Sequence, residues 1–145
     1  MSGYSRILIA VDLGEVSDEV CGRGADLARR YGAQANLVHV VEPVLVDPVY
    51  DMMPAVPFEL ELQHLESVRR QVGELGSRFA IHGNRCFVET GATRAEIIRV
   101  AEELAVQLIV VGSHSRRGAA RLLGSTASSV LHAAPCDVLA VRISD

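Results

Sequence analysis

The chain has 145 residues, of which 49% are hydrophobic and 22% charged, and its formal net charge at pH 7 is −4. This length is typical of a single domain, the apolar fraction excludes a disordered chain, and no apolar run approaches the roughly 18 residues that a membrane span needs. The acidic balance disfavours nucleic-acid binding, and the first residues lack the apolar stretch of a signal peptide, so we expect one cytoplasmic domain over residues 1–145 with no nucleic-acid or membrane partner.

The first part of the chain predicts a strand, a helix and a second strand. Residues 7–11 form an unbroken apolar run, which is typical of a strand buried on both faces. Apolar residues then recur at three- and four-residue spacing from Val16 to Tyr31, which predicts a helix that stops at Gly32. Residues 35–41, Ala-Asn-Leu-Val-His-Val-Val, are mostly apolar and predict the second buried strand.

The middle of the chain predicts a long loop, a helix and an edge strand. The connection over residues 42–56 carries three prolines, and loops of that length are often functional. Pro57 suits the first position of a helix, and an amphipathic stripe continues from there to about Ile81. Residues 85–89 are shorter and more polar, which favours a strand at the edge of the sheet.

The last third of the chain predicts helix, strand, helix and strand in turn. Thr93 and Glu96 have the spacing of a capping box and predict the start of a helix. Residues 108–112 form a buried strand, a polar loop follows, and residues 124–132 predict a short helix before a final strand at 138–141. Strands that alternate with helices in this way imply a parallel α/β sheet with helices on both faces.

Cysteine and lysine usage excludes several chemistries. Three widely separated cysteines, Cys21, Cys86 and Cys136, form neither a disulfide framework nor a zinc motif, and we expect them to be small buried apolar residues. All fourteen basic residues are arginine, which excludes Schiff-base chemistry and a P-loop lysine. No metal-binding motif appears in the sequence, so a metal is expected only as Mg²⁺ carried by nucleotide phosphates.

Two segments follow predicted strands at the edge where open α/β sheets bind ligands. Residues 11–14 follow the first strand, and residues 112–118 follow the fourth and lead to a predicted helix start at Gly124. Small residues let backbone N–H groups approach an anion, and a helix N-terminus adds a partial positive charge. Four hydroxyls are further potential donors, those of Ser113, Ser115, Ser125 and Thr126. The pattern favours a phosphate site, although such Gly-Ser clusters also occur in ordinary loops.

Five stretches of the chain form a wider pattern: Arg6-Ile-Leu-Ile-Ala-Val-Asp12, Leu37-Val-His-Val40, Leu108-Ile-Val-Val-Gly-Ser-His114, Leu122-Leu-Gly-Ser-Thr126 and Ala134-Pro-Cys-Asp-Val-Leu-Ala-Val141. Together they resemble the universal stress protein family, in the right order and over essentially the whole chain. The resemblance implies a flavodoxin-like (Rossmann-like) fold with five parallel strands in the order 3-2-1-4-5. It also implies a homodimer that binds ATP as a regulatory switch in a stress response and acts on an unknown protein partner.

The resemblance also places the nucleotide. The adenine and ribose would lie against the ends of the first two strands, at Ala10, Val11, Asp12 and Val40. The ribose and the first phosphate would approach Val111 and Gly112, and the distal phosphates would lie at Gly124, Ser125 and Thr126. Members of the family often dimerise through the last strand, which here is residues 138–142.

The phosphate motif departs from the family pattern at one position. Nucleotide-binding members carry a motif close to G-x-x-G, followed after eight or nine residues by G-[S/T], and Gly112, Gly124 and Ser125 match it. Ser115 stands at the second glycine; if that backbone is left-handed, a non-glycine residue costs about 1–2 kcal/mol, roughly a tenfold loss of affinity or somewhat more. The family also contains members that lack the glycines and bind no ATP.

Several alternatives stay open. The chain could be a dimeric stress-response interaction module that binds no nucleotide, or a slow ATPase or self-phosphorylating protein with hydroxyls of this loop as acceptors. No general base is well supported, so we expect no catalytic residue and no enzyme. Asp12 could instead cap the first helix, and His39, inside a buried strand, is expected to be a hydrogen-bonded core histidine. His114 and the loop arginines are expected to be solvated.

Overall fold

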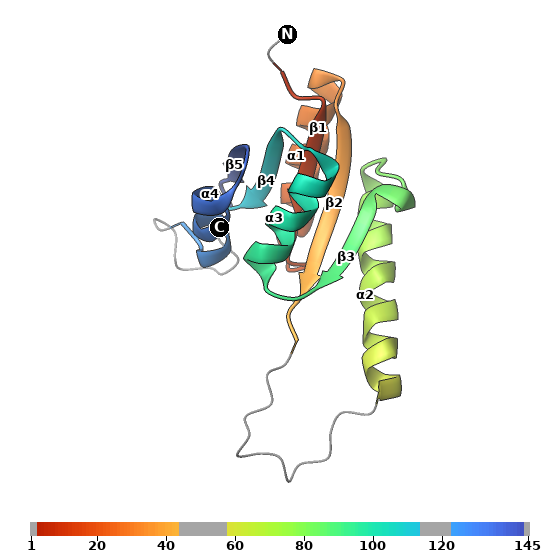
Figure 1. The fold of residues 1–145 in the computed structure, drawn as a ribbon. Helices are drawn as coiled ribbons and strands as arrows, with labels where there is room; N and C mark the ends of the chain where they lie inside the picture. The colour runs from red at the N-terminus through yellow and green to blue at the C-terminus, as the bar shows by residue number, and fades with distance from the viewer. Residues whose placement is uncertain (1–2, 44–57, 114–122, 144–145) are drawn as a thin grey trace.

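The structure is a computed structural model that describes residues 3–43, 58–113 and 123–143. In these residues, strands and helices alternate as β1 (Arg6–Ala10), α1 (Ser17–Tyr31), β2 (Gln34–Val41), α2 (Phe58–Arg78), β3 (Cys86–Thr90), α3 (Thr93–Leu104), β4 (Leu108–Gly112), α4 (Ser125–Ala133) and β5 (Asp137–Val141). All neighbouring strands are parallel, and the order β3-β2-β1-β4-β5 confirms the predicted topology (Figure 1).

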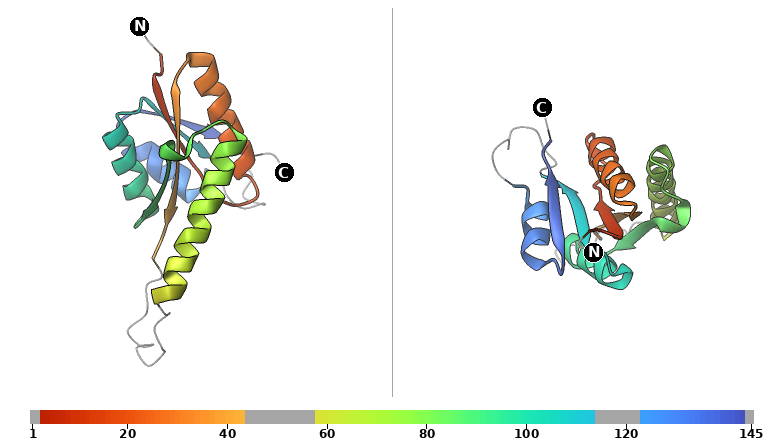
Figure 2. Two further views of the ribbon diagram at one scale, coloured as in Figure 1. Left: turned by 90° about the vertical axis from the view of Figure 1, so that its right-hand side faces the viewer. Right: turned by 90° about the horizontal axis from the view of Figure 1, so that it is seen from above.

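The sheet lies between two helical layers, with α1 and α2 on one side and α3 and α4 on the other (Figure 2). Successive side chains of a strand point to opposite faces. Ile7 and Ile9 therefore pack with α1 and α2, whereas Leu8 and Ala10 pack with α3 and α4. Because both faces are covered, the strand reads as one continuous apolar run in the sequence.

Helix ends show where local sequence decides the structure and where it does not. Helix α1 ends as predicted at Gly32, whose φ of +65° is the left-handed conformation that favours glycine. Helix α3 ends in the same way at Ala105, with φ of +52°, although alanine gives no such signal. Helix α2 ends at Arg78, so the predicted end near Ile81 is about one turn too late. The predicted helical position of Pro57 lies outside the described residues, as do residues 44–57 of the loop.

Helix α2 carries its apolar stripe only part of the way along its length. Val68, Val72 and Leu75 are buried against the sheet, as the stripe predicts. Leu60 and Leu62 are 52% and 43% exposed, because the 21-residue helix extends past the short strand β3 beside it (Figure 1). The amphipathic pattern therefore predicts the helix correctly but overstates how much of it is covered by the described residues.

The predicted capping box at Thr93 and Glu96 is wrong. The N-cap of α3 is Ala92, and no side chain makes a capping hydrogen bond from that position. Thr93 Oγ1 instead donates to Glu42 Oε1 at 2.6 Å, and the Thr93 backbone N–H donates to the same oxygen at 3.4 Å. A carboxylate from the end of β2 therefore satisfies the first turn of α3, which local spacing could not reveal.

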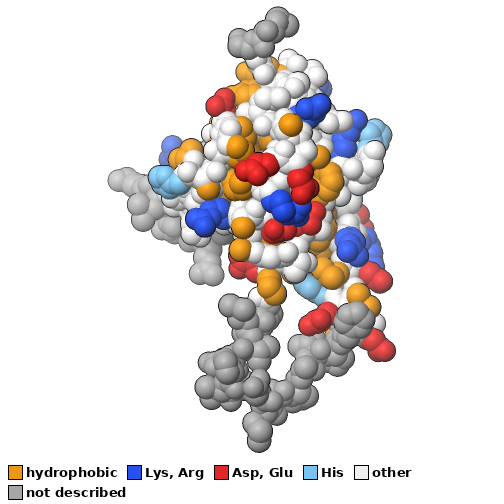
Figure 3. Space-filling model, in the orientation of Figure 1, with side chains coloured by type: hydrophobic (Ala, Val, Ile, Leu, Met, Phe, Trp, Pro, Cys, Tyr) orange, Lys and Arg blue, Asp and Glu red, His pale blue; other side chains and the backbone are white. Residues whose placement is uncertain are grey.

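With Ala92 as the N-cap, Glu96 lies one position past that of a capping box, and its carboxylate pairs with Arg99. Arg99 is the centre of a cluster of acidic side chains. Its guanidinium nitrogens lie 3.0 Å from Glu89 Oε2, 2.9 Å from Glu96 Oε1 and 2.7 Å from Glu103 Oε1. Figure 3 shows acidic and basic side chains side by side on this face of the molecule. Single exposed pairs contribute little, but the contact with Glu89 joins α3 to β3.

The cysteines follow the prediction only in part. Cys21 is buried, and burial raises the pKa of its thiol to about 12, so it stays protonated at neutral pH. Cys86 and Cys136 are half-buried rather than buried, and desolvation raises the pKa of both thiols. Within the described part of the chain, no cluster of three or more ligating side chains could hold a metal ion, and no helix is both long and apolar enough to cross a membrane.

Candidate functional site

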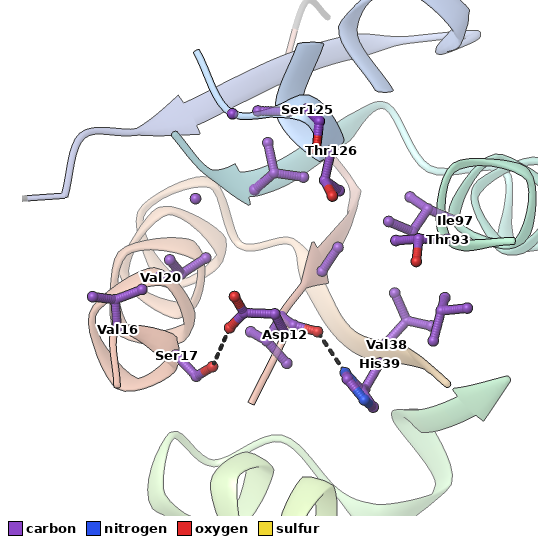
Figure 4. A pocket seen from close by; sticks show the side chains of 17 residues that line it. Asp12, Val16, Ser17, Val20, Val38, His39, Thr93, Ile97, Ser125 and Thr126 are labelled. Carbon is purple, nitrogen blue, oxygen red and sulfur yellow. Dashed lines mark hydrogen bonds between the residues drawn. The ribbon is translucent and has the colours of Figure 1, made fainter. Parts of the chain in front are cut away.

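A cavity of about 160 Å³ lies at the carboxyl ends of the central strands. From β1 the chain first builds the sheet outward through β2 and β3, and then continues on the other side of β1 with β4 and β5. This reversal is the switch point at which open α/β sheets bind ligands. Figure 4 shows side chains from the ends of β1 and β2 and the starts of α1, α3 and α4 pointing into the cavity.

Nine of the eleven site residues predicted from the sequence line this cavity. They are Ala10, Val11, Asp12, Val40, Val111, Gly112, Gly124, Ser125 and Thr126. Ser113 is not among the lining residues: its Oγ accepts a hydrogen bond from the Ile143 backbone N–H at 3.3 Å, which turns it toward the end of β5. Ser115 lies outside the described residues, as do His114, Arg116, Arg117 and Arg121.

Asp12 holds the turn that leaves β1. Its Oδ1 accepts hydrogen bonds from the Gly14 backbone N–H at 2.8 Å and from Ser17 Oγ at 3.3 Å. Leu13, between them, has a φ of +63°, a conformation that costs a non-glycine residue free energy. The N-cap of α1 is Val16, so Asp12 is not the helix cap that the alternative interpretation assigned to it. Its carboxylate fixes the turn and lines the cavity at the same time.

His39 supports the same turn from the neighbouring strand. Its Nδ1 lies 2.8 Å from the Val11 carbonyl oxygen, and because a carbonyl only accepts, Nδ1 carries the hydrogen. The Val11 backbone N–H donates to the Val38 carbonyl at 3.0 Å, so β2 holds both polar groups of the residue before Asp12. The predicted hydrogen-bonded role of His39 is confirmed, although the ring is half-buried and lines the cavity rather than the core.

The end of the cavity at α4 suits an anion. Gly124 is the N-cap of this helix, and no side chain of the described residues caps it. The first N–H groups of a helix have no partner within the helix, and they carry its partial positive charge. Ser125 and Thr126 follow on the first turn with exposed hydroxyls, and Gly112 at the end of β4 completes a border of small residues. This geometry is typical of phosphate sites at helix N-termini.

The opposite end is mostly apolar. Val38 and Ile97 line it, and Thr93 adds one hydroxyl from the first turn of α3 (Figure 4). Val40, two residues after Val38 on β2, also lines the cavity. The hydrogen bonds from the Thr93 hydroxyl and backbone N–H hold the pKa of Glu42 below its usual range, so this carboxyl is ionised at neutral pH. Thr93 and Ile97 were not predicted as site residues from the sequence. They could have been found only from the predicted topology, which places the start of the helix after β3 beside the end of β2.

Known proteins of one family match this sequence over nearly its whole length. The model of the universal stress protein family matches residues 3–142. Universal stress protein A homolog 1 of Coxiella burnetii is 39% identical over 144 residues, which cover 98% of this chain and 99% of the relative. Universal stress protein G of Escherichia coli O157:H7 is 34% identical over 144 residues, which cover 96% and 99% of the two chains.

Solved structures show the same fold. Hypothetical protein MJ0577 superimposes with a TM-score of 0.79 at 20% identity, over 99% of both chains. A universal stress protein in complex with cAMP superimposes with a TM-score of 0.66 at 21% identity, over 99% of this chain and 100% of the other. At these identities the likeness concerns the fold, and it confirms the predicted flavodoxin-like α/β architecture.

Proposed function

The chain belongs to the universal stress protein family, and from this premise we propose that it is an ATP-binding regulatory protein that acts as a homodimer. The observation that carries the proposal is a cavity with two unlike ends, one apolar and one formed by the start of α4. ATP has the same two halves, a flat apolar base and an anionic tail. The complex of one structural neighbour with cAMP supports an adenine nucleotide as the ligand class.

The size of the cavity suggests how ATP is divided along it. At about 160 Å³ it is smaller than the roughly 300–1,000 Å³ of common small-molecule sites. We therefore place the base and ribose inside it and the phosphates at its mouth, along the first turn of α4. Gly124, Ser125 and Thr126 would hold the phosphates, and Mg²⁺ would arrive with them.

The proposed switch depends on the two parts of the protein that ATP would contact together. The start of α4 and the turn at Asp12 belong to different helical layers, and the nucleotide would contact both. A ligand shifts a protein toward the arrangement that it binds better, by as much as its affinities for the two arrangements differ. ATP would thus favour one relative placement of α4 and this turn, and so one surface offered to a protein partner.

Calorimetry with ATP and Mg²⁺ tests the proposal. We expect micromolar affinity, about −8 kcal/mol, and its loss in Gly124→Val, because a branched side chain would occupy the place where phosphates approach the helix backbone. Gly83→Val is the matched control, since an added Cβ at Gly83 meets nothing within 4 Å and that residue is remote from the cavity lining. No heat at millimolar ATP would contradict the proposal and favour the interaction module without nucleotide.

We also propose that the dimer forms through β5, where residues 138–142 were predicted to pair. Among the described strands β5 pairs only with β4, so its other edge has no partner in the described part of the chain. The Val141 carbonyl accepts from the Ser113 N–H on the β4 side. The backbone groups of the adjacent Ala140 therefore point to the other edge, because neighbouring residues of a strand point their polar groups to opposite sides. An exposed strand edge pairs readily with a second chain.

Ala140→Pro is expected to halve the mass of the particle in size-exclusion chromatography with light scattering. Proline removes the outward N–H that a partner strand would use, while the ladder to β4 keeps its donors. Ala140→Ser keeps the N–H and serves as the control that should remain a dimer. A dimer that persists in Ala140→Pro would place the interface elsewhere.

A further inference from the structure

We propose that Thr93, held by Glu42, makes the cavity select purines that carry an amino group at C6 over purines that carry a carbonyl there. This inference rests on the proposed nucleotide site and identifies the residue pair that would set its base preference. It concerns two side chains that the sequence interpretation did not place in the site.

The geometry of the pair is well defined. Thr93 lies on the first turn of α3, and its side chain forms the cavity wall beside Ile97 (Figure 4). Its Oγ1 lies 2.6 Å from Glu42 Oε1, and its backbone N–H reaches the same oxygen at 3.4 Å. Glu42 is exposed and does not line the cavity, so it holds the threonine from outside.

The chemistry of the pair determines what Thr93 can offer a ligand. An ionised carboxylate only accepts hydrogen bonds, so the Thr93 hydroxyl must donate its single proton to Glu42. The favourable hydrogen bonds to this carboxylate lower its pKa and keep it ionised at neutral pH. What remains for the cavity is the pair of acceptor sites on Thr93 Oγ1. The hydroxyl, normally able to donate or accept, is thereby restricted to accepting.

The base is the part of a nucleotide that meets this acceptor. The anionic tail belongs at the start of α4, which leaves the end near Val38, Val40 and Ile97 for the flat apolar ring. Of the two lining residues that α3 contributes, Thr93 is the polar one. His39 already uses Nδ1 on the Val11 carbonyl. The edge of a base pointing toward α3 therefore meets an acceptor that needs an N–H.

A 6-amino purine supplies that N–H, whereas a 6-oxo purine presents an oxygen to an oxygen. A buried polar group left without its partner weakens binding by about tenfold to a hundredfold. A site that requires a hydrogen bond discriminates strongly against the analogue that cannot make it. The expected order is therefore ATP well above inosine triphosphate, which differs from ATP at C6 and in the proton on N1.

The test compares ATP and inosine triphosphate by calorimetry on the full chain. We expect the wild type to bind ATP at least tenfold more tightly. In Thr93→Val the ratio should fall toward one, because the hydroxyl is lost at nearly constant volume. Thr93→Ser should restore the ratio, since it retains the acceptor. Thr90→Val makes the same chemical change at an exposed residue outside the cavity lining and should leave the ratio unchanged.

The variant Glu42→Gln is a second, independent test of the same affinity ratio. The neutral amide can donate as well as accept, so Thr93 is free to turn its proton toward the cavity. Inosine triphosphate should then bind more tightly while ATP loses little, and the ratio should again fall. If Thr93→Val does not fold, Glu42→Gln alone tests whether the Thr93–Glu42 pair sets the base preference.

The outcomes separate this inference from the proposed function. Equal affinities of the wild type for the two nucleotides would overturn the role of Thr93 and leave the ATP site standing. A preference for ATP that survives both Thr93→Val and Glu42→Gln would also overturn it and assign the selection to another group. Absence of ATP binding in the wild type would overturn both proposals.

Discussion

Replacing Asp12 with alanine is expected to weaken ATP binding by about tenfold to a hundredfold while the protein remains folded. The Asp12 carboxylate accepts hydrogen bonds from the Gly14 N–H and from Ser17 Oγ, and it lines the cavity. Hydrogen bonds to a charged group contribute about 1.5–3 kcal/mol each, and 1.4 kcal/mol is a factor of ten in affinity. Without the carboxylate, nothing offsets the left-handed φ of +63° at Leu13, so the turn relaxes away from the ligand.

Asp12→Asn separates the turn from the charge. The amide oxygen of asparagine can accept both hydrogen bonds, so we expect the thermal midpoint to return close to that of the wild type. Affinity should recover only in part, because a neutral acceptor binds ribose hydroxyls less strongly than a carboxylate. The measurements are calorimetry with Mg-ATP and thermal unfolding without ligand.

Asp18→Ala, on the first turn of α1, is the matched control, because it removes a carboxylate a few residues further along the chain. Asp18 forms an exposed ion pair with Arg78 at 2.8 Å and is not part of the cavity lining. Removing such a pair changes the free energy of unfolding by less than about 1 kcal/mol. ATP affinity should stay at the wild-type value. If Asp12→Ala also left it unchanged, the turn after β1 would not belong to the nucleotide site.

The fold was predictable because its signals are local and repeated. The central strands read as short, mostly apolar runs, and the first three helices show spacing of three and four residues between apolar positions. The stop at Gly32 needs only the conformational freedom of one residue. The strand order is different: it was implied by the family resemblance, because no local pattern determines which strands become neighbours.

The candidate site was predictable where its residues stand at strand ends. Nine lining residues follow from the ends of β1, β2 and β4 and the start of α4. The α3 wall was not predictable, because the contact between Thr93 and Glu42 joins residues 51 positions apart. Locally, Thr93 and Glu96 fit a capping box, yet the N-cap is Ala92 and the Thr93 hydroxyl donates to the distant Glu42. Where a local rule competes with a long-range partner, spacing alone cannot decide.

Gly24→Ala and Gly73→Ala are expected to change stability in opposite directions, although both replace a glycine inside a helix. An added Cβ at Gly24 would lie 2.5 Å from Ile9 Cγ1 and 2.6 Å from Ile9 Cδ1. Ile9 is fully buried in the central strand, and side chains in a protein core are closely packed. Overpacking costs about 1–3 kcal/mol and outweighs the gain of up to about 1 kcal/mol from alanine in a helix. At Gly73 the Cβ meets nothing within 4 Å, so only that gain applies.

Urea unfolding measures both effects, and an unchanged slope will show that only stability has changed. The midpoint should fall in Gly24→Ala and rise slightly in Gly73→Ala. Combining Gly24→Ala with Ile9→Ala should cost less than the sum of the single changes, because the second substitution removes the atoms that clash. Additive costs, or midpoints that move in the same direction, would contradict close packing between α1 and β1.

The same pair of variants connects the core to the cavity. Helix α1 begins at Ser17, whose hydroxyl donates to Asp12, and Gly24 lies two turns further along the same helix. A Cβ at Gly24 would push α1 away from β1 and disturb the turn that Asp12 holds. Gly24→Ala should therefore also weaken ATP binding, whereas Gly73→Ala on α2 should leave it unchanged. Equal ATP affinities in the two variants would mean that the turn keeps its shape independently of the seating of α1.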